Sequence, residues 1–212
     1  MNNQENHLET LSEIRSIMER STKFISLSGL SGIFSGIFAI LGAIPALIYF
    51  GYGIKAQNVY QYSRTADDLV NYPFFILFFG DALLILTLAI STAIFLTIRN
   101  ARKNGQPYYD ASAKRLLINL FIPLAAGGIF CIILMLHGHF GMVAPATLLF
   151  YGLALFNAGK YTLNDIRYLG LCEIILGLIS SYYVGYGILF WIAGFGVLHI
   201  IYGTVMYFKY ER

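Results

Sequence analysis

Residues 23–38, KFISLSGLSGIFSGIF, combine an apolar sequence with a small side chain at nearly every helical turn. Small residues recur every four positions in two rows, Ser28, Gly32 and Gly36, and Ser31, Ser35, Ala39 and Ala43. Helices in lipid associate by close packing, and small side chains let two backbones approach each other. We therefore expect a membrane helix with a small-residue seam, which packs either within its own bundle or against a second copy of the chain.

The composition indicates that most of the chain lies in lipid. Hydrophobic residues make up 58% of the 212 residues and charged residues only 12%, about half the usual share in soluble domains. A soluble fold of this size has too little interior for so much apolar surface. The net charge of +3 comes from bases scattered between apolar runs, which argues against nucleic acid as a partner and leaves membrane lipids as the expected one.

Six apolar runs predict an all-α bundle of six membrane-spanning helices. A helix needs about 20 apolar residues to cross the hydrocarbon layer, and the fourth and fifth runs are shorter than this. We read both as spanning, because the distribution of charge requires an even number of crossings. The runs cover residues 24–50, 73–98, 116–136, 142–158, 168–183 and 188–208.

Lysine and arginine set the expected orientation, since positive residues concentrate on the cytoplasmic side of membrane proteins. With both termini in the cytoplasm, only Lys55 and Arg64 of the 14 basic residues fall outside. Residues 1–23 then form a cytoplasmic segment, and residues 24–212 form the transmembrane domain.

The cytoplasmic segment carries a pattern typical of a short amphipathic helix at residues 7–22. Thr10 and Glu13 fit a capping box, and Leu8, Leu11, Ile14 and Met18 share one face. We expect this helix to lie on the inner membrane surface. The alternative is a docking helix for a cytoplasmic protein partner.

Residues 15–34, RSIMERSTKFISLSGLSGIF, resemble the signature of a family of uncharacterised small polytopic inner-membrane proteins of bacteria. The resemblance covers about 20 residues at the start of the first helix, and it implies a location in the bacterial cytoplasmic membrane. The family has no established activity, so it assigns no functional residues.

Three ionisable residues fall inside the apolar runs, where such groups are costly and mark functional candidates. At 1.5 Å per residue, Asp81 lies about 12 Å and His199 about 17 Å from the outer face, and Glu173 about 8 Å from the inner face. Glu173 and His199 then differ by about 5 Å in depth. We expect them to face each other within the hairpin of the last two helices, with Asp81 as a further candidate neighbour. The pair is either a static polar contact or a proton or solute site.

The remaining sequence features give weaker indications of a functional site. Pro123, next to Gly127 and Gly128, predicts a kink or hinge in the third helix. His137 and His139 are weak metal candidates, because a zinc site needs three or four ligands. The sequence has no nucleophile elbow, zinc-protease motif or P-loop, so we expect no cofactor and lean away from an enzyme.

Three functional classes follow, in order of preference. The first is a non-enzymatic sensory or accessory protein that acts through helix packing and partner contacts. The second is a small-solute or proton-coupled transporter, as a homodimer, that uses Asp81, Glu173 and His199. The third is a lipid-modifying membrane enzyme.

Overall fold

The computed structural model describes residues 23–50, 63, 71–105, 107 and 109–212. The amphipathic segment predicted at residues 7–22 lies outside these ranges, as do Lys55 and Arg64. Within the described ranges every regular element is a helix or helical turn, and none is a strand. The all-α class predicted from composition and periodicity is therefore present.

Three long helices come first, α2 (Gly29–Phe50), α4 (Tyr72–Lys103) and α5 (Ala111–Leu136). A short turn, η1 (Phe140–Met142), leads into α6 (Val143–Ala158), and α7 (Asp165–Tyr182) follows. The final helix is continuous from Gly187 to Tyr210 and consists of α8 (Gly187–Trp191), the π-helical stretch η2 (Ile192–Leu198) and α9 (His199–Tyr210).

Five helical segments in the described ranges are long and apolar enough to cross a membrane: α2, α4, α5, the η1–α6 unit and the final helix. The apolar run expected at residues 168–183 corresponds to α7, which is not among the five. This helix carries Asp165, Arg167 and Glu173 within its 18 residues. A larger share of its residues is charged than in any of the other five.

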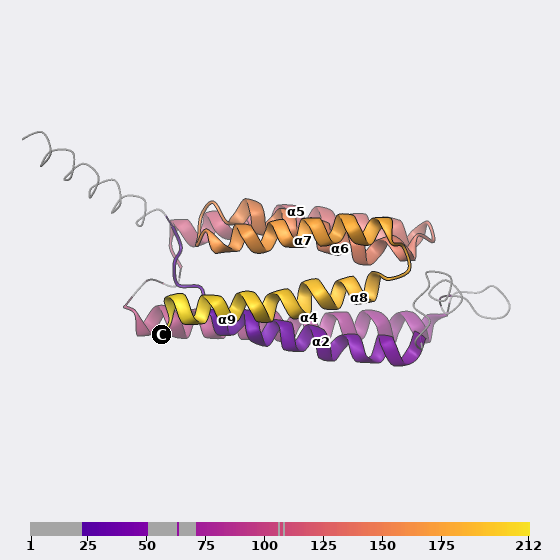
Figure 1. Cartoon of the computed structure of the whole chain (residues 1–212), viewed down its shortest axis with the longest axis horizontal. Helices are drawn as coiled ribbons and strands as arrows, with labels where there is room; N and C mark the ends of the chain where they lie inside the picture. Colours follow the sequence, from indigo (N-terminus) through magenta and orange to yellow (C-terminus); the bar gives the residue numbers. More distant parts are fainter. Residues whose placement is uncertain (1–22, 51–62, 64–70, 106, 108) are drawn as a thin grey trace, which may run out of the picture.

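The helices form two layers that lie side by side (Figure 1). One layer contains α2, α4 and the final helix, with α2 packed against both of the others. The second layer contains α5, α6 and α7, with α6 in the middle. The final helix contacts α6 and α7 through α8, η2 and α9, so it forms the principal junction between the layers.

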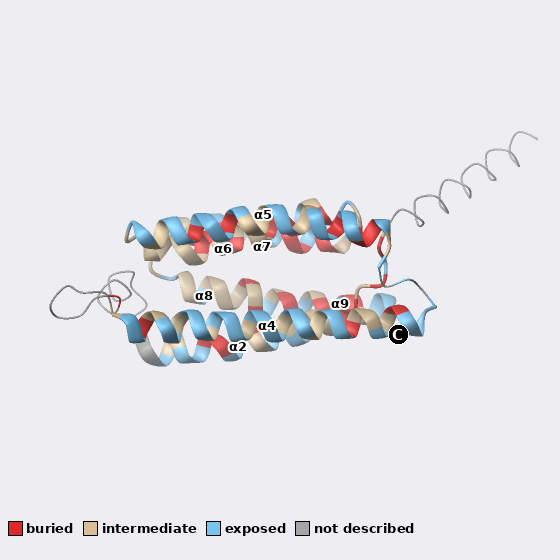
Figure 2. Ribbon diagram, turned by 180° about the vertical axis from the view of Figure 1, so that it is seen from behind, coloured by how far each residue is buried: buried red, intermediate tan, exposed pale blue. Residues whose placement is uncertain are grey.

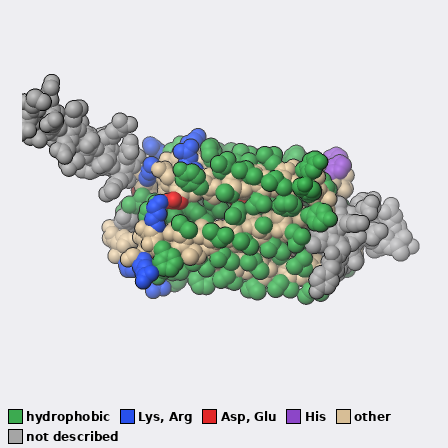
Figure 3. Space-filling model, in the orientation of Figure 1, with side chains coloured by type: hydrophobic (Ala, Val, Ile, Leu, Met, Phe, Trp, Pro, Cys, Tyr) green, Lys and Arg blue, Asp and Glu red, His purple; other side chains and the backbone are tan. Residues whose placement is uncertain are grey.

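The buried residues lie on the helix faces that turn toward each other (Figure 2). Large apolar side chains are exposed on the outside of the bundle (Figure 3). Many of the buried residues are small, such as Ala39, Ala101 and Ala154. This distribution is expected in lipid, where large apolar side chains gain little from burial and small ones allow close packing.

The small-residue seam predicted on the first helix packs inside the bundle, against the final helix. A methyl group on Gly32 would lie 3.1 Å from the Cα of Gly203, and one on Gly36 would lie 2.6 Å from the Gly196 carbonyl oxygen. Ser28 and Ala39 are buried, and Ser35 is half-buried. Of the two alternatives from the sequence, packing within the chain is the one observed for Gly32 and Gly36.

The helix α2 begins at Gly29, five residues after the start of its apolar run. Residues 24–28 are extended and cross from one layer to the other (Figure 1). Phe24 N–H donates to the Tyr161 carbonyl (2.8 Å), and the Thr162 hydroxyl donates to the Phe24 carbonyl (2.6 Å). Since these bonds occupy the backbone of Phe24 before it can enter a helix, the helix starts later than the apolar run predicts.

Basic side chains gather at one end of the bundle (Figure 3). This end contains the last turn of α4, with Arg102 and Lys103, and the last turn of the final helix, with Lys209. The first turn of α5, capped by Asp110, which accepts a hydrogen bond from Ala113 N–H (2.7 Å), starts at the same end. We call it the basic end.

Candidate functional site

Glu173 is the most deeply buried acidic residue in the described part of the chain. Its side chain is 0% exposed, in the middle of α7. Neither carboxyl oxygen has a hydrogen-bond partner among the described residues. A charged carboxylate that is buried without a hydrogen-bond donor is strongly disfavoured. The Glu173 carboxyl group therefore needs either a bound proton or a cation beside it.

His199 lies opposite Glu173, as the depth estimate predicted. Its Nδ1 atom is 3.5 Å from Glu173 Oε1, and its side chain is 8% exposed. The same Nδ1 lies 3.0 Å from the Gly194 carbonyl, and Nε2 lies 2.7 Å from the Tyr151 hydroxyl. A carbonyl only accepts hydrogen bonds, so Nδ1 carries the proton, and Nε2 accepts from Tyr151.

The π-helical stretch η2 precedes His199 and contributes the backbone of the site. A π-helix within an α-helix is rare, and it occurs often at functional sites. Here the Gly194 carbonyl accepts from the His199 side chain. Glycine at position 194 leaves room for the neighbouring side chains. A methyl group there would collide with Glu173 Oε2 and lie 2.5 Å from Leu148 Cδ2.

Helix irregularity therefore occurs in the sixth apolar run, whereas the sequence pointed to the third. The helix α5 runs from Ala111 to Leu136 with Pro123 inside it and without interruption. Gly127 packs against Phe150, and Gly128 faces open space. The helix thus continues through Pro123, and the kink or hinge expected there stays a prediction.

Aromatic rings extend from the site along the final helix and α6. The Phe195 ring lies 5.0 Å from those of Tyr151 and Trp191 and 6.0 Å from the His199 imidazole, measured between centroids. Tyr151 and His199 also stack, at 5.4 Å. These rings hold the imidazole in place, so that Glu173 and His199 keep their relative orientation.

Two further hydroxyl groups are buried without a hydrogen-bond partner in the described structure, those of Ser180 and Tyr202. Ser180 lies two helical turns beyond Glu173 on α7, and Tyr202 lies one turn beyond His199 on α9. Native proteins leave few buried polar atoms unsatisfied, and those that remain are often functional. Four such atoms occur in this region, counting both oxygens of Glu173.

Asp81 lies in another part of the bundle. The helix α4 packs against α2, and a methyl group on Gly42 of α2 would lie 3.6 Å from Asp81 Oδ2. None of the interactions found for the described residues joins Asp81 to Glu173 or His199. The structure thus brings together two of the three predicted acidic and imidazole groups.

The histidines considered as metal ligands occupy a helix terminus. His137 follows the last residue of α5, and its Nδ1 lies 2.9 Å from the Ile133 carbonyl. His139 precedes η1. In the described ranges no three side chains of histidine, cysteine, aspartate or glutamate come together as a metal site.

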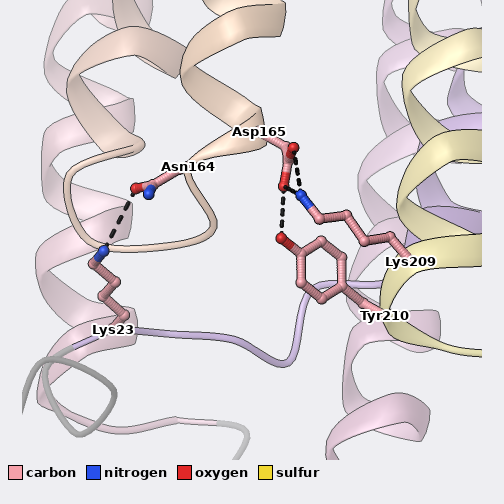
Figure 4. A network of polar contacts seen from close by, with 5 residues as sticks. All are labelled: Lys23, Asn164, Asp165, Lys209 and Tyr210. Atoms are coloured by element: carbon pink, nitrogen blue, oxygen red, sulfur yellow. Dashed lines mark hydrogen bonds and ion pairs between the residues drawn. The ribbon is translucent and has the colours of Figure 1, made fainter. Parts of the chain in front are cut away.

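At the basic end, Asp165 of α7 joins the two layers (Figure 4). Its carboxylate accepts hydrogen bonds from Lys209 Nζ (2.9 and 3.0 Å) and from the Tyr210 hydroxyl (2.6 Å). Burial opposes the charged form of Asp165, but the hydrogen bonds from Tyr210 and Lys209 outweigh it and hold its pKa below the ordinary value. Nearby, Lys23 Nζ donates to Asn164 Oδ1 (3.4 Å).

The sequence alone did not identify Tyr151, Tyr202 or Ser180. Tyrosine is common at membrane interfaces, which made the two tyrosine positions look ordinary. A signal was present nonetheless, because Tyr151 lies in the middle of the fourth apolar run and Tyr202 follows His199 by three residues. A spacing of three places Tyr202 and His199 on one side of a helix.

The chain matches no protein-family model, no curated protein and no solved structure. The functional argument therefore depends on the geometry of the site.

Proposed function

We propose that the chain is a six-span protein of the bacterial cytoplasmic membrane that couples movement of a small solute to protonation of Glu173. Both termini lie in the cytoplasm, and the basic end is the cytoplasmic end. Glu173 binds the proton, His199 and Tyr151 deliver it, and the two layers provide the surfaces between which a solute moves.

The proposed topology is supported by the placement of charge. The described helix termini that carry lysine or arginine lie at the basic end, as the positive-inside rule requires. The chain enters α7 and leaves the final helix at this end, so α7 must return the chain to the outer side. The apolar part of α7, residues 168–182, is then the fifth of the six spans, and Asp165 lies outside it.

One observation carries the functional proposal: a fully buried carboxyl group that has no hydrogen-bond donor and faces an imidazole. No lysine or arginine among the described residues forms an ion pair with Glu173. A purely structural acid in lipid finds a fixed partner, because an unpaired buried charge is expensive. A carboxyl that exchanges a proton must instead remain free to change its charge.

The test is a pH titration of the purified full chain in detergent, followed by infrared absorption of the carboxyl group. We expect a titrating band that disappears in Glu173→Gln and persists in Asp110→Asn. The control makes the same acid-to-amide change at a helix cap, where asparagine caps as well as aspartate. A wild-type protein without a Glu173-dependent band across the pH range in which it stays folded would contradict the proposal.

A second experiment addresses transport. Proteoliposomes with a trapped pH indicator are exposed to gradients of amino acids, sugars and organic amines in turn. We expect a solute of one of these classes to change the internal pH with wild-type protein and to have no effect with Glu173→Gln. Solute uptake that is independent of Glu173 would contradict coupling at this residue.

The accessory role is the second candidate, and the α2–α9 contact favours it. A methyl group on Gly203 would lie 2.6 Å from the Gly29 carbonyl oxygen and 2.5 Å from Ile33 N. Such backbone-to-backbone contact makes this part of the bundle rigid, as expected of a protein that acts as a scaffold. The same contact uses the seam within the chain, however, so the seam is not available for a partner.

A further inference from the structure

Two basic side chains share one exposed surface at the carboxyl end of α6. Lys160 follows the residue that ends this helix, and Arg167 lies in the first turn of α7. Both side chains are exposed. A methyl group on Gly159 would collide with Arg167 Cγ, so the Arg167 side chain lies across the end of α6, beside Lys160.

Neutral groups hold both cations in place. Lys160 Nζ donates to Asn157 Oδ1 (3.3 Å), and the Arg167 guanidinium lies over the Phe156 ring, 5.1 Å from its centroid. Among the described residues, no carboxylate forms an ion pair with either cation. Asp165, two residues before Arg167, is bound instead to the final helix (Figure 4). The two cations are therefore fixed in position while their charge stays uncompensated.

Side-chain amides extend this surface to α5. Asn157 Nδ2 donates to the Asn119 side-chain oxygen (3.0 Å) and to the Asn119 carbonyl (3.2 Å). Asn119 Nδ2 donates in turn to the Arg115 carbonyl (2.8 Å). The Arg115 side chain is exposed, and within the described ranges it too has no carboxylate partner. A third uncompensated cation thus lies at the same end of the surface.

The same two helix faces are apolar and exposed farther into the membrane. Phe156 and Leu153 lie one and two turns before Lys160, and Ile118 and Ile122 lie one and two turns after Arg115. Residues at these spacings share one face of a helix. A molecule on this surface therefore meets positive charge at one end and apolar side chains along the rest of its length.

We infer that this surface binds an anionic phospholipid. Lys160 and Arg167 contact its phosphate group, Arg115 adds positive charge, and the acyl chains lie along α5 and α6. A guanidinium suits phosphate because it donates two parallel hydrogen bonds. A zwitterionic headgroup carries its own positive charge, so the surface favours a headgroup with a net negative charge. The inference goes beyond the proposed proton binding at Glu173 and does not depend on it.

The test is native mass spectrometry of the full chain in detergent, titrated in parallel with phosphatidylglycerol and phosphatidylcholine. We expect wild-type protein to bind phosphatidylglycerol more tightly than phosphatidylcholine. In the double variant Lys160→Gln, Arg167→Gln we expect the affinity for phosphatidylglycerol to fall about 25-fold, since each cation at a lipid surface contributes about fivefold. The affinity of this variant for phosphatidylcholine should stay unchanged.

The matched control is the double variant Arg102→Gln, Lys103→Gln. It removes two exposed cations from the last turn of α4, at the same end of the bundle but in the other layer, and should bind phosphatidylglycerol as wild type does. Equal weakening in the two double variants would overturn the inference, because it would show general attraction to the basic end. Equal affinity of wild-type protein for the two lipids would overturn it as well.

Two further measurements complete the test. Inorganic phosphate is added to the complex with phosphatidylglycerol, and we expect the lipid to stay bound, since the acyl chains contribute to binding. Displacement by phosphate would overturn the inference in favour of a soluble anion. If the double variant does not fold, Lys160→Gln alone is used, because this side chain is exposed. An affinity for phosphatidylglycerol equal to that of wild type in this variant would also overturn the inference.

Discussion

The final helix has two interfaces of opposite character. Toward α2 it presents Gly203, which lies against the backbone of α2, and Gly196, which lies against the side chain of Ile40. Toward α6 and α7 it presents His199 and Tyr202, beside buried polar atoms that lack partners. The first interface tolerates no added atom, while the second holds groups able to change their charge. One helix therefore combines a fixed contact and a chemically adjustable one on different faces.

The largest effect is expected at the fixed contact. In Gly203→Ala the new methyl group would lie 2.5 Å from Ile33 N and 2.6 Å from the Gly29 carbonyl oxygen. Backbone atoms cannot move aside as side chains do, so we expect a loss of about 3 kcal/mol or more. The measurement is thermal unfolding of the detergent-solubilised protein, followed by size-exclusion chromatography.

Gly128→Ala is the matched control for this change. Gly128 lies in α5 with no atom near the position of a new methyl group, and alanine favours a helix by about 0.5–1 kcal/mol over glycine. We expect unchanged or slightly higher stability. Equal losses in the two variants would show that the α2–α9 contact is not especially close.

A moderate loss of stability is expected at Gly194, which lies in the second interface and faces side chains rather than backbone. The methyl group of Gly194→Ala would press on the carboxyl end of Glu173 and on Leu148 Cδ2, both of which are ends of side chains that can turn away. We expect a loss of about 1–2 kcal/mol and a shifted midpoint in the infrared titration of Glu173, because the carboxyl moves relative to His199. A midpoint identical to wild type would separate Gly194 from the site.

The smallest effect is expected at Asp165, whose partner Lys209 is half exposed. The folded pKa of Asp165 lies below its ordinary value, so its contribution to stability is present above the ordinary pKa of aspartate and is lost as the pH falls through the lower folded value. We expect Asp165→Asn to lower the unfolding temperature by about 1–2 °C at neutral pH and to have no effect in strong acid.

A double-variant cycle with Lys209→Met sharpens this last prediction. If the effects of Asp165→Asn and Lys209→Met simply add in the double variant, the two side chains are not coupled. A double variant that is no less stable than Asp165→Asn alone would show that the ion pair accounts for the effect.

The sequence predicted much of the fold, because apolar runs of membrane length leave few alternatives to helices. It also predicted the facing of Glu173 and His199, since a hairpin fixes the relative depth of residues on its two helices. It did not predict that α2 begins only at Gly29. That start depends on hydrogen bonds between Phe24 and the residues Tyr161 and Thr162, more than 130 residues away in the chain.

The remainder of the site depends on lateral packing, which depth alone does not determine. The depth expected for Asp81 from the sequence is compatible with the site, but Asp81 belongs to a helix that packs against α2. Tyr151 comes from α6, whose contact with the final helix is set by the junction of two layers. The π-helical stretch η2 rotates the residues after it relative to those before it. The spacing of apolar residues in the sequence did not predict this rotation.

The extended segment 24–28 has a consequence for the order in which the protein is completed. Its groups are bonded to residues that the ribosome makes much later, including Glu211, whose carboxylate accepts from Gly29 N–H and from the Ser28 hydroxyl (3.1 Å). The hydrogen bonds from Ser28 and Gly29 at the start of α2 can therefore form only after Glu211 has been made, 182 residues after Gly29 in the chain.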